Sequence, residues 1–185
     1  MADRLEKVLA AIDGANGADP AGRALIYGQH MSETLRRFSP GASEVLQIAA
    51  RAQHIERWLM PRDTYPEGRV AYLTWRKNLQ KHHARRAGEL MAVAGYGEAE
   101  IARAASLLKK ERLKQDAETQ VLEDAICLVF LEHEAPEFIA KHDDGKVRDI
   151  LRKTARKMSE QGLVAAGALP LDGRLARLLG EALIA

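Results

Sequence analysis

The stretch "QVLEDAICLVFLEH", residues 120–133, indicates the fold class of this protein. Its apolar residues surround the helix axis instead of forming one stripe, which is typical of a helix buried on all sides. Asp116 stands ahead of it as a candidate N-cap, so we expect a central helix from about residue 117 to His133. Such a helix has to be covered by further elements, and the rest of the chain predicts which kind.

Helical periodicity continues through the remaining sequence, and no stretch alternates convincingly between apolar and polar residues. Asp19-Pro20 and Ser43 are typical of helix starts, whereas Gly95, Gly97 and Gly162 are typical of helix ends. We expect further helices at about 2–13, 20–38, 44–59, 69–94, 98–113, 146–161 and 173–184. The sequence therefore predicts an all-α fold, with residues 1–185 forming a single compact domain of about seven to eight helices.

Composition narrows the classes of protein that fit. The single cysteine, Cys127, excludes an internal disulfide framework and favours the reducing cytoplasm. No apolar run approaches the length of a membrane span, and the first residues lack a signal-peptide core. The net charge of +2 is too small to indicate nucleic acid by itself, so nucleic acid is a weakly supported partner.

Two polar residues fall on apolar helix faces. Asp124 projects into an apolar sector of the central helix, where a carboxylate must be protonated, paired with a cation or bound to a metal. His83 points inward from the helix at 69–94 and needs a partner from another helix. A buried Asp–Arg or Asp–His pair and a core histidine are the alternative, purely structural interpretations. Glu123 is expected to be more peripheral than Asp124.

His54 is harder to place. In "EVLQIAARAQHIERW", residues 44–58, it lies opposite the main apolar sector, in a row with Gln47, Arg51 and Trp58. That row is either solvated or faces a polar cleft, and Trp58 favours a cleft because an indole is costly to leave in water.

Arginines cluster around the loop "PRDTYP", residues 61–66. A loop fixed by two prolines, with Tyr65 near Arg62, could close over an anion, because guanidinium forks match phosphate and carboxylate groups. We therefore expect a small anionic ligand. A second basic group, at residues 148–157, is more typical of a solvated helix face.

Several stretches resemble a family of uncharacterised bacterial and fungal proteins known as a domain of unknown function. They are "QIAARAQHIERW", "PRDTYPEGRVAYLTWR", "LEDAICLVFLEHE" and "KVRDILRKTARKMSEQG". The resemblance covers most of residues 24–162 and leaves 163–185 as a C-terminal extension that includes the last helix.

The order of elements also resembles the HD-domain superfamily of metal-dependent phosphohydrolases. "AARAQHIERW" is similar to the segment that carries the family's His-Asp pair, with His54 matching the histidine. In the superfamily a helix pair follows that segment, and the two helices that start near His83 are similar to it. Asp124 matches the last motif aspartate of the superfamily. His30 or Glu33, in "YGQHMSETL", stands where the first histidine belongs. Ile55 occupies the place of the bridging aspartate, so Glu56 would need a change of register to replace it.

Two hypotheses follow from this resemblance. In the first, the protein is a metal-dependent phosphohydrolase with a divalent transition metal (Mn, Fe, Zn or Ni), which polarises a small phosphorylated substrate and activates a water. Its metal ligands would be His54, His83, Asp124 and Glu33, with Glu56 and Arg57 as catalytic residues and Trp58, Arg62, Tyr65, Arg69 and Arg76 binding the anionic group. In the second, Ile55 marks a helical binding module that has lost its metal and binds an anionic ligand, RNA or a protein.

Overall fold

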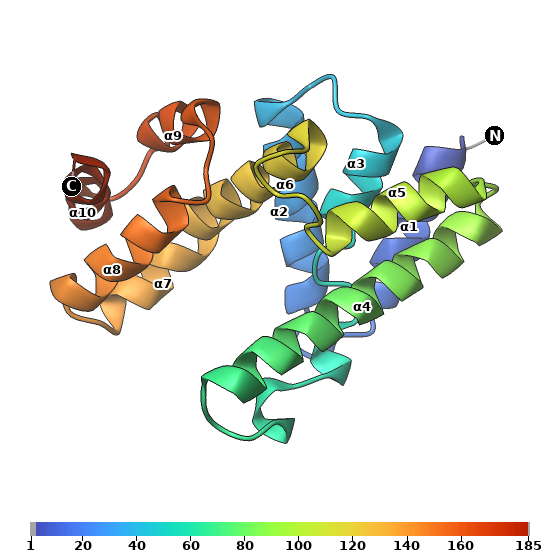
Figure 1. Ribbon diagram of the computed structural model, residues 1–185, viewed down its shortest axis with the longest axis horizontal. Coiled ribbons are helices and arrows are strands. Elements are labelled where there is room, and N and C mark those ends of the chain that lie inside the picture. The colour runs from blue at the N-terminus through green and yellow to red at the C-terminus, as the bar shows by residue number, and fades with distance from the viewer. Residues whose placement is uncertain (1–2, 185) are drawn as a thin grey trace. The chain divides into compact units, whose positions relative to one another are not determined.

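The computed structural model describes residues 3–184, and over these residues it is all-α, with ten α-helices and no strand (Figure 1). This confirms the fold class that the sequence predicts. None of the helices in the described range is long and apolar enough to cross a membrane. The chain forms two compact units, residues 1–112 and 113–185.

The first unit holds the first five α-helices. They are α1 (Arg4–Asn16), α2 (Arg23–Phe38), α3 (Glu44–Arg51), α4 (Arg69–Val93) and α5 (Glu98–Leu108), with short 3₁₀ turns η1 (Arg57–Leu59) and η2 (Arg62–Thr64) between α3 and α4. Helix α3 packs against α1, α2 and α5, and α4 lies alongside α5 (Figure 1). The side chains of Leu46, Ile48, Ala49 and Ala50 on α3 are buried, so this short helix forms the centre of the unit.

The second unit begins with the apolar helix. Its elements are α6 (Ala117–Val129), the π-helical turn η3 (Phe130–Glu134), α7 (Ala135–Ala140), α8 (Asp144–Ala155), α9 (Glu160–Gly167) and α10 (Gly173–Ile184). Helix α10 packs on α8 and α7, and α9 packs on α6. Asp116 caps α6 by accepting a hydrogen bond from the Thr119 N–H at 2.8 Å, as the sequence predicts.

The helix expected at 44–59 ends at Arg51, so the prediction is wrong for residues 52–59. Ser43 does cap it, accepting from the Leu46 N–H at 3.1 Å, but the chain leaves the helix after Arg51 and turns. Glu56 adopts a left-handed conformation (φ 53°), and its N–H donates to the Asn16 side chain at 3.1 Å. A tertiary partner thus replaces the helical one, and His54 lies in a turn, where helix-face reasoning does not apply.

Two other expected boundaries are also wrong. Asp19 accepts hydrogen bonds from the N–H groups of Ala21 and Ala24, yet α2 starts only at Arg23, after a left-handed Gly22. Gly162 does not end a helix: it lies in the first turn of α9, whose N-cap is Ser159.

Asp124 is buried, at 1 % exposure, as the sequence predicts. Its partners are neutral donors. Oδ1 accepts from the Ser159 N–H at 2.8 Å and from the Gln120 amide at 3.1 Å, and Oδ2 accepts from the Ser159 hydroxyl at 2.6 Å. Asp124 therefore fixes the start of α9 on α6. Glu123, expected to be peripheral, is also buried, at 3 % exposure.

We predict that Gly162→Ala destabilises the protein. A Cβ at position 162 would lie 2.6 Å from the Asp124 Oδ1, so the carboxylate would be pushed off Ser159. We expect a loss of about 1–3 kcal/mol in the free energy of unfolding, measured by urea denaturation. Gly167→Ala in the same helix is the matched control: a Cβ there meets nothing within 4 Å. Equal stabilities of the two variants would contradict this account of Asp124.

Candidate functional site

The turn that follows α3 carries the candidate site. Ile55 is fully buried and anchors the turn in the core. Its neighbours contact other elements of the first unit: His54 stacks on Tyr27 of α2, and Glu56 accepts from Arg86 of α4. The Arg57 N–H donates to the His54 carbonyl at 3.1 Å, which closes the turn and begins η1.

Glu56 holds this turn through its side chain. Its Oε1 accepts a hydrogen bond from the Arg86 Nε on α4 at 2.9 Å, and its Oε2 lies 3.1 Å from the His82 Nε2. A left-handed conformation costs a non-glycine residue about 1 kcal/mol or more, so these contacts have to offset that cost. Arg86 and His82 thus connect the Glu56 carboxylate to α4, and a catalytic role of Glu56 stays a prediction.

His54 is a neutral imidazole between an aromatic ring and a cation. The Tyr27 ring stacks on it with centroids 3.7 Å apart, and the Arg57 guanidinium donates to its Nε2 at 3.0 Å. Nε2 is therefore an acceptor, which puts the ring proton on Nδ1. Burial, followed by the charges of Arg57 and its surroundings, lowers the pKa of His54 well below its ordinary value.

His83 points inward from α4 with 5 % exposure, which confirms the prediction from its helix face. Its ring centroid lies 6.3 Å from that of His54. Burial, followed by the neighbouring His82 and Arg57, lowers the pKa of His83 to about 3. Its Nε2 is buried and has no hydrogen-bond partner within the described residues.

The charges of several cationic side chains act on His54. Lys110 and Arg76 join Arg57 in lowering the His54 pKa. The Arg57 guanidinium stacks on the Trp75 ring at 4.9 Å, while the indole N–H donates to the Met60 carbonyl at 2.9 Å. Arg76 lies 5.9 Å from the Tyr72 ring, and over residues 3–184 no ion pair of Arg76 is present. The named charges that act on His54 from Arg57, Arg76 and Lys110 are thus all positive.

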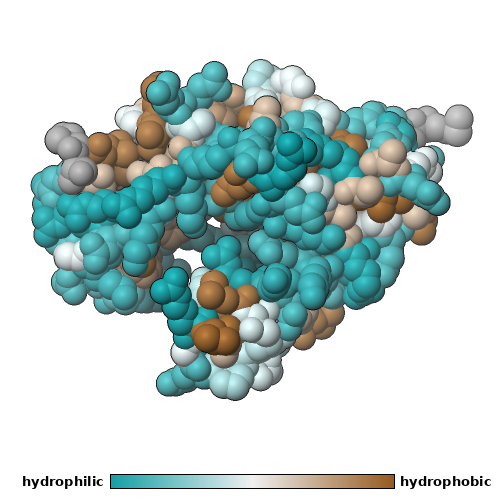
Figure 2. Space-filling view, viewed as in Figure 1, coloured by the Kyte–Doolittle hydropathy of each residue, from teal (hydrophilic) through white to brown (hydrophobic). Residues whose placement is uncertain are grey.

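The arginine loop is held together by its own residues. The Arg62 guanidinium donates to the carbonyls of Tyr65 and Pro66, both at 3.0 Å, and the Tyr65 hydroxyl accepts from Asn78 at 3.1 Å. Arg62 and Tyr65 thus have structural partners, whereas Arg69 is exposed at the start of α4. Figure 2 shows apolar surface at the lower edge of the molecule, where Figure 1 places the start of α4, and the exposed apolar residues there include Val70 and Leu73.

The expected metal ligands are distributed between the two units. His54, His83 and Glu33 belong to the first unit and Asp124 to the second. Glu33 is exposed on α2, and Trp58 is half-buried in η1. Across residues 3–184, no group of three or more His, Cys, Asp or Glu side chains is arranged to hold a metal ion.

The two imidazoles are also poorly placed to share one ion as they stand. Two histidines bound to one tetrahedral metal have ring centroids about 5 Å apart, and His54 Nε2 already accepts from Arg57. A metal here would require Arg57 to move away. The metal centre stays a prediction.

Sequence reasoning missed the π-helical turn at Phe130–Glu134, in which the Glu132 Oε2 lies 3.7 Å from the His133 Nε2. Pro136 is the signal that was available. It lacks an N–H and its ring clashes with the carbonyl four residues earlier, so the helix widens by one residue and continues as α7 instead of ending at His133. Tyr27 and Lys110 were missed as well, because neither lies near His54 in the sequence.

Fold and site together define an all-α protein whose first unit holds a buried His83, a half-buried His54 and an arginine, Arg57, hydrogen-bonded to His54. A family described as "Domain of unknown function (DUF4202)" matches residues 6–179. The chain belongs to this family. Comparison with curated proteins gives no match, and comparison with solved structures gives none either.

We predict that His83 makes the protein less stable in acid. Its pKa is about 3 when folded and about 6.5 when unfolded, so the unfolded state takes up a proton first and stability falls as the pH drops below about 6.5. Between pH 7 and pH 5 this residue alone should cost about 2 kcal/mol. In His83→Leu, the difference in unfolding free energy between the two pH values should shrink by that amount. An unchanged difference, measured by urea denaturation at both pH values, would show that His83 titrates normally.

Proposed function

We propose that the first unit binds a small phosphorylated molecule, with its phosphate between Arg57 and Arg76 and beside His54. The observation that carries this proposal is that Arg57 donates to the His54 Nε2 at 3.0 Å and that the charges of Arg76 and Lys110, from two other segments of the chain, act on the same histidine. Such an arrangement raises the local concentration of anions and compensates a buried negative charge.

Arg57 is preorganised for this role. Its hydrogen bond to the His54 Nε2 and its stacking on Trp75 restrict a side chain that would otherwise lose rotamer freedom on binding. A guanidinium has five N–H donors, and the bond to His54 involves one of them. The planar guanidinium fork matches the two oxygens of a phosphate.

The number of charges favours a phosphate over a single carboxylate. Three cations suit a group that carries close to two negative charges at neutral pH. A bound dianion would also favour protonation of His54, because an opposite charge stabilises the charged form of a titrating group. Binding is therefore expected to raise the pKa of His54.

The proposal is tested with inorganic pyrophosphate as probe and isothermal titration calorimetry at low salt. Loss of one charge-assisted contact costs about 1.5–3 kcal/mol, so Arg57→Gln and Arg76→Gln should each weaken binding about tenfold or more. Lys77→Gln, an exposed neighbour on α4, is the matched control and should bind like the wild type. An equal loss in all three variants would reduce the effect to net charge, and full affinity in Arg57→Gln would overturn the site.

Metal-dependent phosphate hydrolysis is the second candidate function, and one observation favours it. The neutral, buried His83 keeps a ring nitrogen without a hydrogen-bond partner, and a neutral imidazole nitrogen is what a transition metal binds. The resemblance to metal-dependent phosphohydrolases adds the reaction class by analogy only.

Elemental analysis of the purified protein separates the two candidates. The hydrolase predicts a stoichiometric transition metal that His83→Ala loses and that the exposed-site control His142→Ala retains. Wild-type protein without bound metal, even after incubation with Mn²⁺, Fe²⁺, Zn²⁺ or Ni²⁺, would leave anion binding as the function and remove hydrolysis.

A further inference from the structure

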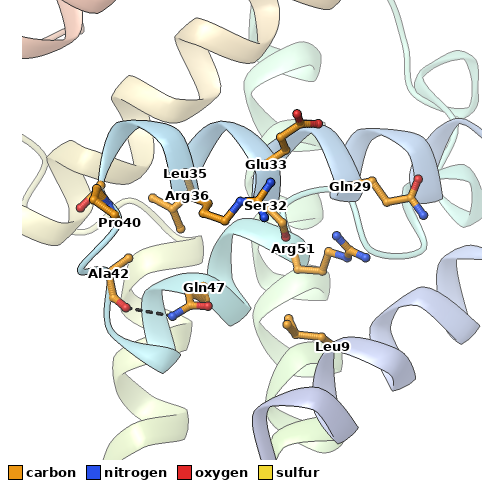
Figure 3. Close-up of a pocket in the computed structure, with 11 residues that line it drawn as sticks. Leu9, Gln29, Ser32, Glu33, Leu35, Arg36, Pro40, Ala42, Gln47 and Arg51 are labelled. Atoms are coloured by element: carbon orange, nitrogen blue, oxygen red, sulfur yellow. Dashed lines mark hydrogen bonds between the residues drawn. The ribbon is translucent and has the colours of Figure 1, made fainter.

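A concave site lies in the first unit, and its lining contains none of the residues of the proposed phosphate site. It is a pocket of about 320 Å³ between α1, α2 and α3, shown in Figure 3. That volume is at the lower end of those that hold small molecules. All of its lining residues belong to the first unit, and neither His54 nor Arg57 is among them.

Arg36 provides the charge of this pocket. Within residues 3–184 it makes no ion pair and no hydrogen bond, and Figure 3 shows its side chain lying along α2 toward Ser32, on the side that faces α3. The Glu33 carboxylate points away from α3 in the same view. Glu33 is thus not placed to neutralise Arg36 inside the pocket.

The other arginine of the pocket is already paired. Arg51 donates to both oxygens of Asp13 on α1, with Nε–Oδ1 at 2.6 Å and Nη2–Oδ2 at 2.5 Å. The charge of Arg51 is therefore compensated, and the ion pair connects α1 to α3. A ligand meets Arg36 as the one uncompensated cation that the described part of this pocket presents.

The rest of the lining is mixed. Leu9 and Leu35 give an apolar wall, and Gln29 and Ser32 add polar groups from α2. The Gln47 amide donates to the Ala42 carbonyl at 2.9 Å, which fixes its orientation and leaves its own carbonyl oxygen as an acceptor. An apolar wall with a few fixed polar groups is the usual composition of a small-molecule site.

We infer that this pocket binds a small monocarboxylate with an apolar body, whose carboxylate pairs with Arg36 and whose body packs on Leu9 and Leu35. The charges favour a monoanion: Asp13 compensates Arg51, so the described lining offers the single uncompensated charge of Arg36 to a ligand. This site and its ligand class are independent of the proposed phosphate site.

Benzoate and benzamide are the probes, because they share one apolar ring and differ in the charged group. Binding is followed by backbone amide chemical shifts of α1, α2 and α3. Benzoate should shift these amides at concentrations where benzamide does not, and Arg36→Gln should weaken benzoate binding about tenfold or more. Arg37→Gln, which changes the next residue of α2 and does not line the pocket, should retain the wild-type affinity.

Each other outcome overturns a defined part of the inference. Equal binding of benzoate and benzamide would remove the carboxylate as the recognised group. Tighter binding of inorganic phosphate than of benzoate, lost in Arg36→Gln, would replace the monocarboxylate by a dianion. Absence of any shift with benzoate in a protein that unfolds cooperatively would remove the site.

Discussion

The site in the first unit depends on how Glu56 is held. Its left-handed backbone ends the run of turns after α3, and its N–H donates to Asn16 of α1 while its carboxylate accepts from Arg86 of α4. Two helices thus fix one residue, and the residues beside it inherit that position: Ile55 enters the core and His54 lies under Tyr27. Strained residues held by tertiary contacts are frequent at functional sites. If the helix had continued past Arg51, His54 would lie in a different place.

Burial lowers the pKa values of His54 and His83 and so keeps both rings neutral. The charges of neighbouring cations act in the same direction. An anion bound beside Arg57 would offset the effect of the cations on the histidine pKa values. It would leave the effect of burial in place. Because both histidines are neutral, they add no positive charge to that of the neighbouring cations.

The sequence predicted features that depend on neighbours within about one helical turn. Ser43 and Asp116 cap the helices expected of them, and the inward His83 and buried Asp124 follow from helical periodicity. The turn at His54 could not be predicted in this way, because Asn16 and Arg86 lie 40 and 30 residues from Glu56. The pocket at Arg36 could not be predicted for the same reason, because three helices form it. In the sequence Arg36 by itself looks like any exposed arginine.

Asp124 shows why a buried carboxylate is ambiguous in a sequence. Periodicity gives its burial but not its partner, and a metal, a cation and a set of neutral donors all satisfy the same electrostatic requirement. Here the donors come from Ser159 and Gln120, and the absence of a side chain at Gly162 makes the approach of α9 to α6 geometrically feasible. A glycine in the first turn of a helix, three residues after a serine cap, was thus the local sign that a helix end approaches another element closely. Asp124 is best understood as the group that binds that helix end, so a catalytic interpretation of this carboxylate would first have to account for how both of its oxygens are released.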